Sequence, residues 1–201
     1  WRRFQPDVIA QLEALARGAP EDLLLHALAT AELSPLKAVV ERSGLDGATA
    51  ERALADLIAG GQIIPLGVVQ PPLAGSNAAA LSLGGWRALA GRMADILADY
   101  HAQYPLRPGL GREELKSRLQ GREKWSARLF NELLVHAVAE GIVEEAGEVV
   151  RRPGYQIAFT AEQQVKVNGL LAAFRRQPYT PPSLAESVAQ TDLELVSALL
   201  H

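Results

Sequence analysis

The chain has 201 residues, 48% of them hydrophobic but only 5% aromatic, which predicts a mostly helical protein with a core of Leu, Ala, Val and Ile. Its formal charge is −3, from 20 basic and 23 acidic residues, which excludes a protein that is cationic over its whole surface. The lack of cysteine excludes disulfides and thiolate metal sites, and no apolar segment is long enough to span a membrane, which favours a cytoplasmic location.

The residues up to 82 predict a connecting helix, three further helices and a β-hairpin. The connecting helix is expected at 1–18, where Pro6 suits the first helical position. Three helices follow, the second with Ser34 as its predicted N-cap, at about 20–31, 34–44 and 48–59. A β-branched segment, a proline-rich turn and a second short segment then predict a hairpin at 62–81. Three helices followed by a hairpin is the order of a winged helix, which we assign to residues 19–82.

The same order of elements repeats in the next part of the chain, and this repeat is the most informative feature of the sequence. A long helix with one apolar face is predicted at 84–103, and a connector containing Pro105 and Pro108 ends it. Two helices and a hairpin that turns at Ala146 and Gly147 follow, at 112–119, 126–140 and 142–151. We assign winged helix 2 to residues 83–158.

Three hydroxyl residues, each with a Gln or Glu three positions later, mark helix starts in the last part of the chain. The pairs are Thr160 with Gln163, Ser183 with Glu186, and Thr191 with Glu194. They predict three helices that no hairpin follows, which we interpret as an incomplete winged helix 3 at residues 159–201. The predicted fold class is therefore mainly α with small β-hairpin wings, built from tandem winged-helix modules.

One stretch of the second module is similar to a known family. From Tyr104 to Arg118 the sequence reads YPLRPGLGREELKSR, and it resembles the second winged helix of bacterial selenocysteine-specific elongation factors. Weaker similarity extends to 12–18, to the hairpin that follows Gly61, and to 160–186. Four winged helices form the C-terminal region of that family, so the resemblance implies that this chain is part of such a region.

The resemblance implies a function in the recoding of UGA codons. Members of the family are translation GTPases that use GTP and Mg²⁺, carry selenocysteinyl-tRNA to the ribosome, and are tethered by their C-terminal winged helices to a hairpin in selenoprotein mRNA. The GTPase domain is not recognisable in this sequence, nor is the last winged helix, which makes the principal contact with the hairpin. We therefore expect this fragment to be a monomer without catalytic activity, cofactor or membrane partner. It would meet the ribosome, the mRNA hairpin and selenocysteinyl-tRNA through the full-length factor.

A local excess of positive charge lies in the second module. Between residues 105 and 128 there are seven basic and three acidic residues. Arg112, Lys116 and Arg118 are spaced to share one side of the predicted helix, where they can meet a phosphate backbone. The alternative is an ordinary solvated helix face whose neighbouring glutamates partner the cations. The predicted RNA-binding residues are Arg107, Arg112, Lys116, Arg118, Arg122 and Lys124.

Other candidate chemistry is better explained by structural roles. No glycine-rich phosphate loop is present, and Gly109-Leu110-Gly111 follows a proline connector rather than a strand, which argues against a nucleotide site. The histidines lack metal-ligand spacing and are interpreted as helix-surface or core-edge residues: His26, His101, His136 and His201. Three hairpin glutamates are expected to be solvated rather than catalytic: Glu144, Glu145 and Glu148. Trp125 either stacks on a base or, as we favour, anchors its loop on the core.

Two other classes of protein also use tandem winged helices. A DNA-binding regulator is disfavoured, because Arg52 on the third helix of the first module lies beside Glu51 and Asp56, a poor surface for a phosphate-lined groove. A chromosome-organising adaptor uses such modules without a cationic helix. A GTPase motif in the sequence preceding Trp1 would favour the elongation-factor interpretation, and its absence would favour the other two.

Overall fold

The computed structural model describes residues 18–29, 33–67, 70–121 and 124–200, which fall into two compact units. One unit comprises the described residues up to Gly91 together with Trp125–His136. The other comprises the described residues of Arg92–Lys124 and those from Ala137 onward. The predicted connecting helix at 1–18 lies outside the described residues except for Gly18.

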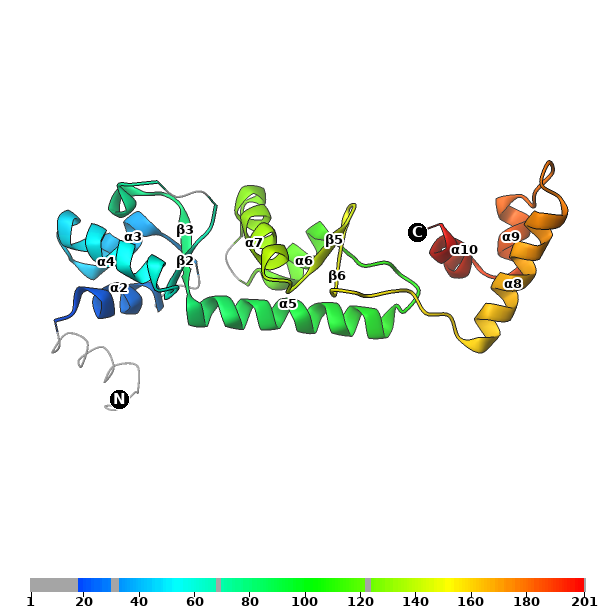
Figure 1. Cartoon of the computed structure of the whole chain (residues 1–201), viewed down its shortest axis with the longest axis horizontal. Helices are drawn as coiled ribbons and strands as arrows, with labels where there is room; N and C mark the ends of the chain where they lie inside the picture. The colour runs from blue at the N-terminus through cyan, green and yellow to red at the C-terminus, as the bar shows by residue number, and fades with distance from the viewer. Residues whose placement is uncertain (1–17, 30–32, 68–69, 122–123, 201) are drawn as a thin grey trace. The chain divides into compact units, whose positions relative to one another are not determined.

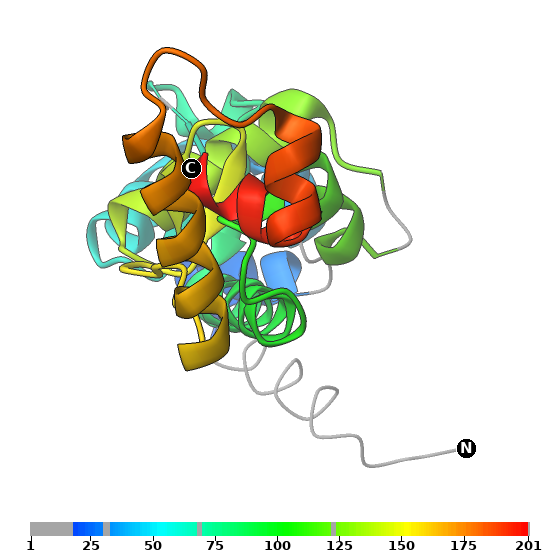
Figure 2. The ribbon, with the colours of Figure 1, turned by 90° about the vertical axis from the view of Figure 1, so that its right-hand side faces the viewer.

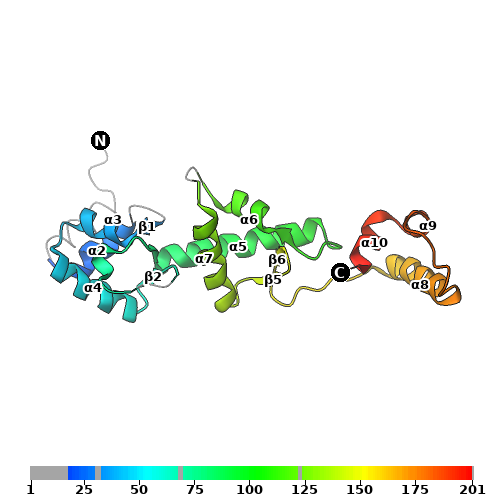
Figure 3. The same cartoon turned by 90° about the horizontal axis from the view of Figure 1, so that it is seen from above.

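The first unit begins with three helices and a three-stranded antiparallel sheet (Figure 1). In chain order the elements are α2 (Pro20–Ala29), β1 (Ser34–Pro35), α3 (Leu36–Ser43), α4 (Gly47–Ala59), β2 (Ile63–Pro65), the short 3-10 helix η1 (Leu73–Gly75) and β3 (Ala79–Ser82). The strand order is β1-β3-β2, with Ser34 opposite Ala80 and Ile63 opposite Ser82. Helix α2 packs against α3 and α4 (Figure 3).

Local sequence signals set the helices of this group. Apolar side chains spaced for one helix face form its core, among them Leu24, Leu28, Val39, Leu54 and Leu57. Helix α4 begins after Asp46, whose carboxylate accepts hydrogen bonds from two backbone N–H groups of the first turn. Helix α3 ends at Ser43 and is followed by Gly44, whose φ of 72° lies in the left-handed region that favours glycine. The observed bounds are therefore close to the predicted ones.

The predicted serine cap of α3 is wrong. Ser34 belongs to β1, is only 3% exposed, and α3 begins at Leu36 with no side-chain cap. The first N–H groups of α3 are satisfied by backbone instead, because Leu36 N donates to Ala78 O and Lys37 N donates to Ser76 O. A strand of two residues has no recognisable periodicity, so a serine ahead of an apolar run resembles a cap.

A second set of helices and strands follows. Its elements are α5 (Leu83–Gln103), β4 (Leu110–Gly111), α6 (Arg112–Leu119), α7 (Ala127–Ala139), β5 (Glu144–Ala146) and β6 (Val149–Arg151). Helices α5 and α7 contain residues of both units, whereas the antiparallel sheet, in the order β4-β6-β5, lies in the second unit. The three predicted helices are confirmed, as is a hairpin that turns at Gly147, where φ is +63°.

Strand β4 does not follow from the sequence. It pairs Leu110 with Val150 and Gly111 with Val149. The chain just before it runs so close to β6 that a Cβ atom placed on Gly109 would lie 2.7 Å from the carbonyl oxygen of Val150. The close approach of this connector to β6 therefore explains the glycine at position 109.

Three helices form the last set, which faces the viewer in Figure 2: α8 (Ala161–Arg176), α9 (Leu184–Gln190) and α10 (Leu193–Leu199). The predicted capping boxes that start α8 and α9 are both present. The third predicted cap, Thr191 with Glu194, is wrong, because the carboxylate of Asp192 accepts the N–H of Leu195 and caps α10. The Thr191 hydroxyl instead donates to the carbonyl oxygens of Ser187 and Asp192.

An apolar cluster within the second unit joins this last set to the connectors before β4 and after β6. Its buried members are Leu106, Val167, Leu195 and Ala198, and its half-buried members are Ile157, Phe159 and Leu199. The predicted fold class, mainly α with small sheets and a winged-helix order of elements, is confirmed. Every helix of the described residues is too short or too polar to cross a membrane. The domain boundaries after residues 18, 82 and 158 stay predictions.

Candidate nucleic-acid interface

The predicted RNA-binding residues that the structure describes lie on α6, in the connector before it and in the loop after it, all in the second unit. Helix α6 is held in place by Leu115 and Leu119, which are 0% and 2% exposed. Arg107 belongs to the connector, and Lys124 is exposed shortly before α7. Arg122 lies outside the described residues.

Two of the cations on α6 form ion pairs along their own helix. Lys116 Nζ lies 3.6 Å from Glu113 Oε2, and Arg118 Nη2 lies 2.5 Å from Glu114 Oε1. Lys116 is also largely covered, since only 14% of its side chain is exposed. This arrangement matches the simpler interpretation of the sequence, in which glutamates of the same helix partner the cations.

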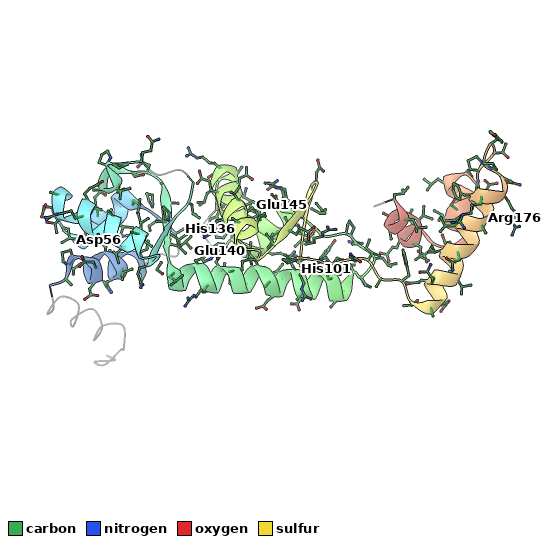
Figure 4. All side chains as sticks on the ribbon, in the orientation of Figure 1. Asp56, His101, His136, Glu140, Glu145 and Arg176 are labelled. Carbon is green, nitrogen blue, oxygen red and sulfur yellow. The ribbon has the colours of Figure 1, made fainter. Side chains whose placement is uncertain are left out.

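The third cation of α6, Arg112, pairs with a residue of the hairpin. Its Nη1 atom lies 2.9 Å from Oε1 of Glu145 in β5, which Figure 4 labels. A second hairpin glutamate, Glu144, pairs across the strands with Arg151. The hydrogen bond from Arg151, followed by that from the Gly154 N–H, lowers the pKa of Glu144. The hairpin glutamates are exposed or half-buried, in line with the sequence analysis, but two of them are paired, which the sequence does not reveal.

Arg107 is held by aromatic rings and by a carboxylate from the last set of helices. Its guanidinium carbon lies 4.2 Å from the centroid of the Tyr104 ring, and its Nη2 lies 3.7 Å from Glu194 Oε1. A hydrogen bond with the side chain of Tyr100 raises the pKa of Arg107. Arg118 lies 5.8 Å from the centroid of the same Tyr100 ring, so two predicted cations converge on the end of α5.

In the described part of the loop before α7, Lys124 and Trp125 have different surroundings. Trp125 is 8% exposed, so the interpretation that it anchors the loop on the core is confirmed. Lys124 beside it is exposed and forms no ion pair with another described residue. Lys124 is thus the predicted cation whose charge is least compensated among those that the structure describes.

Most of the described cations in this set, which we call the patch around α6, are therefore paired with carboxylates. The patch comprises Arg107, Arg112, Lys116, Arg118, Arg122 and Lys124. Glu145 and Glu194, the partners of Arg112 and Arg107, come from outside the segment whose charges predict the patch. Exposed ion pairs contribute only about 0–1 kcal/mol each, so a phosphate can replace a carboxylate partner at small cost. Phosphate binding here would exchange one anion for another rather than neutralise free charge.

His101, near the C-terminal end of α5, is a core-edge residue, as predicted (Figure 4). It is 5% exposed, its ring is stacked on that of Tyr155 with 3.5 Å between centroids, and its Nε2 accepts the Arg152 N–H at 3.4 Å. Burial, followed by the positive charges of Arg152 and Arg151, lowers the pKa of His101. The Tyr155 hydroxyl donates to the carbonyl oxygen of Pro105 at 2.7 Å. These contacts tie the segment after β6 to the connector before β4.

Groups of three or more His, Asp or Glu side chains that could hold a metal ion do not occur in the described part of the chain. His136 faces Trp86 edge-on, with 4.5 Å between ring centroids, and is half-buried. His101 and His136 therefore both pack against aromatic rings, which is a structural role. His201 lies outside the described residues.

One part of the chain is similar to a known protein family. Residues 94–151 match the family model described as elongation factor SelB, winged helix. No curated protein matches the chain significantly. The match confirms the resemblance inferred from the sequence: this segment is similar to a winged helix of the SelB family. All six predicted RNA-binding positions fall inside the matched range.

Proposed function

We propose that this chain is an RNA-binding region of a selenocysteine-specific translation elongation factor. In this function it helps to couple the delivery of selenocysteinyl-tRNA at UGA codons to a hairpin in selenoprotein mRNA. The SelB-type winged helix at residues 94–151 is the observation that carries the proposal. The repeated order of three helices and a hairpin agrees with a region made of several such modules.

The proposed contact is electrostatic and is made by the patch around α6. Arg107, Arg112 and Arg118 have between 37% and 48% of their side chains exposed, which leaves N–H donors available to phosphate oxygens. Lys124 is exposed and forms no ion pair with another described residue, and Lys116 and Arg122 complete the proposed set. Contacts to phosphate fix position without reading sequence, so this surface would hold ribosomal RNA or bound tRNA rather than select a particular message.

The wider context follows from the same proposal. The full-length factor would use GTP and Mg²⁺ in a GTPase domain, whereas this region would act as a monomer in the cytoplasm and need no cofactor. Its partners would be the ribosome, the mRNA hairpin and selenocysteinyl-tRNA. The module that reads the hairpin in the resembling family is not recognisable here, so we expect little sequence-dependent affinity for that hairpin.

A DNA-binding regulator is the less favoured alternative, and the contacts of α4 argue against it. The carboxylate of Glu51 accepts the N–H groups of Leu73 and Ala74 at 2.8 and 2.7 Å, which commits it to holding η1. Arg52 Nε donates to the carbonyl oxygen of Ala48 at 3.4 Å. The helix that would enter a major groove therefore presents polar groups already used within the module.

Salt-dependent RNA binding tests the proposal. Binding of the chain to a fluorescein-labelled structured RNA would be measured by anisotropy over a series of salt concentrations. Replacing Arg112 and Lys116 together by alanine should weaken binding about equally for unrelated RNA sequences. The same double variant should flatten the dependence of log K on log salt by about one to two units.

A matched control distinguishes the patch from general loss of charge. Lys37 and Arg42 lie on α3, and Lys37 is paired with Glu41 one helical turn away at 4.0 Å, much as the cations of α6 are paired. The Lys37→Ala/Arg42→Ala variant should keep the affinity and salt slope of the unmodified chain. Equal behaviour of both double variants would show that the patch is an ordinary solvated helix face. Failure of the unmodified chain to bind RNA at low salt would remove the proposed function.

A further inference from the structure

A second candidate surface lies outside the patch, at the end of α8 and in the loop that follows it, residues 175–182. Its central feature is Tyr179, whose exposed fraction is 97%. Aromatic side chains usually bury most of their area, because their large apolar surface gives a strong gain on burial. A tyrosine that stands fully in solvent is thus a ring available to a partner.

Tyr179 lies in a hydrogen-bonded turn of the backbone. Thr180 N donates to the carbonyl oxygen of Gln177 at 3.2 Å, which closes a turn with Pro178 and Tyr179 at its two central positions. Proline at the first central position restricts the turn before any partner arrives, and Pro181 and Pro182 stiffen the chain beyond it. A contact made by Tyr179 would therefore cost little additional ordering of the loop.

Two uncompensated cations stand beside the turn. Arg175 and Arg176 lie in the last turn of α8, both are exposed, and neither forms an ion pair with a described residue. Figure 4 labels Arg176. Residues 173–182 contain no Asp or Glu. The Oε2 atom of the nearby Glu186 carboxylate accepts the N–H and the hydroxyl of Ser183, each at 2.8 Å. These arginines thus differ from the cations of α6, each of which has a carboxylate partner.

A hollow of about 260 Å³ borders the turn, and its polar lining residues are Arg176, Gln177, Thr180, Glu186 and Gln190. These side chains offer donors and acceptors suited to phosphate and sugar oxygens. A planar ring, adjacent free guanidinium groups and a polar recess are the elements by which proteins hold unpaired nucleotides. Double-stranded RNA would engage only the cations, since its bases are stacked inside the helix.

We propose that residues 175–182 bind an unpaired segment of RNA, with a base stacked on Tyr179 and phosphates contacted by Arg175 and Arg176. This proposal rests on the proposed function, because it assumes that the chain binds RNA. It adds a second RNA contact, in the last set of helices, and this contact distinguishes looped RNA from duplex RNA. The patch around α6 would make no such distinction.

Two labelled RNAs test the proposal: a hairpin with an unpaired purine loop, and a blunt duplex of the same stem. Tyr179→Ala should weaken binding of the hairpin about five-fold or more, the effect of losing one base stack, and leave binding of the duplex unchanged. Tyr179→Phe, which keeps the ring, should keep the affinity for the hairpin. Arg175→Ala/Arg176→Ala should weaken both RNAs and flatten the salt slope by about one to two units.

Arg42→Ala is the matched control, because Arg42 is also an exposed arginine in the last turn of a helix. It should leave the affinity for both RNAs unchanged, and circular dichroism should show that all variants melt like the unmodified chain. If Tyr179→Ala keeps full affinity for the hairpin while Arg112→Ala/Lys116→Ala loses affinity, the inference is wrong and the proposed function stands.

Other outcomes would overturn the inference in different ways. Equal weakening of hairpin and duplex by Tyr179→Ala would contradict base stacking. Equal affinity for a DNA hairpin of the same sequence would contradict a site for RNA. Loss of ribosome binding without loss of RNA binding would identify the turn as a protein contact. If the unmodified chain binds neither RNA at low salt, the inference and the proposed function fail together.

Discussion

Replacing Gly109 by alanine tests whether the approach of the connector to β6 positions α6. The added Cβ would lie 2.7 Å from the carbonyl oxygen of Val150 and 3.1 Å from its carbonyl carbon. Both atoms belong to the backbone of a strand, so no side-chain rotation relieves the contact. Either β6 shifts or the pairing of Leu110 with Val150 opens.

The expected loss of stability follows from two opposing effects. Overpacking against a well-packed element costs about 1–3 kcal/mol. The change from glycine to alanine also restricts the unfolded chain, which stabilises the folded state by about 0.4–1 kcal/mol. The net free energy of unfolding should therefore fall by about 1–2 kcal/mol, which lowers the melting temperature of a module of this size by several degrees.

Gly91 provides a control with the same chemical change and the opposite expected sign. It lies in the interior of α5, is exposed, and a Cβ placed on it meets no atom within 4 Å. Gly91→Ala should raise the free energy of unfolding by about 0.5–1 kcal/mol, because alanine is the better helix former. Urea unfolding followed by circular dichroism measures both variants. A Gly109→Ala variant as stable as the Gly91→Ala variant would refute the close approach of the connector at Gly109 to β6.

Three further predictions concern the second unit. Because the pKa of His101 is lowered in the folded state, the unfolded chain takes up a proton first as the pH falls. Melting temperatures should therefore decrease below about pH 6.5, and His101→Gln should flatten that decrease. Thr160→Ala removes the capping box of α8 and should lower the free energy of unfolding by about 1 kcal/mol in urea titrations, whereas Thr160→Asp should restore it. Leu195→Ala should lower the free energy of unfolding by about 2–5 kcal/mol, because the Leu195 side chain is 0% exposed. Leu193 is 64% exposed, so Leu193→Ala should change the free energy of unfolding by no more than about 0.5 kcal/mol in the same titration.

The helices could be predicted from the sequence because their signals are local. Apolar residues recur with the period of one helix face, and the Thr160 and Ser183 capping boxes lie within one turn of the helices that they start. The hairpin at Gly147 was predictable for the same reason, since a glycine between two β-branched segments allows the required positive φ. Each of these features depends on residues only a few positions apart.

Features that depend on pairing with distant residues could not be predicted. Strands β1 and β4 have two residues each, and only the later strands β3 and β6 give them partners. For the same reason Ser34 resembles a helix cap although it is a strand residue. The choice of Asp192 over Thr191 at the start of α10 is a different case, because both residues have side-chain oxygens and only the backbone path selects between them.

The candidate site shows how a count of charges along the sequence overestimates a patch. The segment 105–128 has an excess of four positive charges, seven basic against three acidic residues. Folding brings Glu145 to Arg112 and Glu194 to Arg107, which leaves an excess of two when both partners are included.

At the end of α8, a count of charges along the sequence instead underestimates the available positive charge. Arg175 and Arg176 are only two charges, so they do not stand out in the sequence. Neither is paired with a carboxylate among the described residues. They lie close in the chain to Tyr179, which is the most exposed of the large hydrophobic side chains that the structure describes. The salt slope reflects the counterions that leave the RNA when cations neutralise its phosphates, and a cation that stays paired with a carboxylate neutralises less phosphate charge. Within the expected range of about one to two units for each double variant, the arginines of α8 should therefore change the salt slope of RNA binding more than the paired cations of α6.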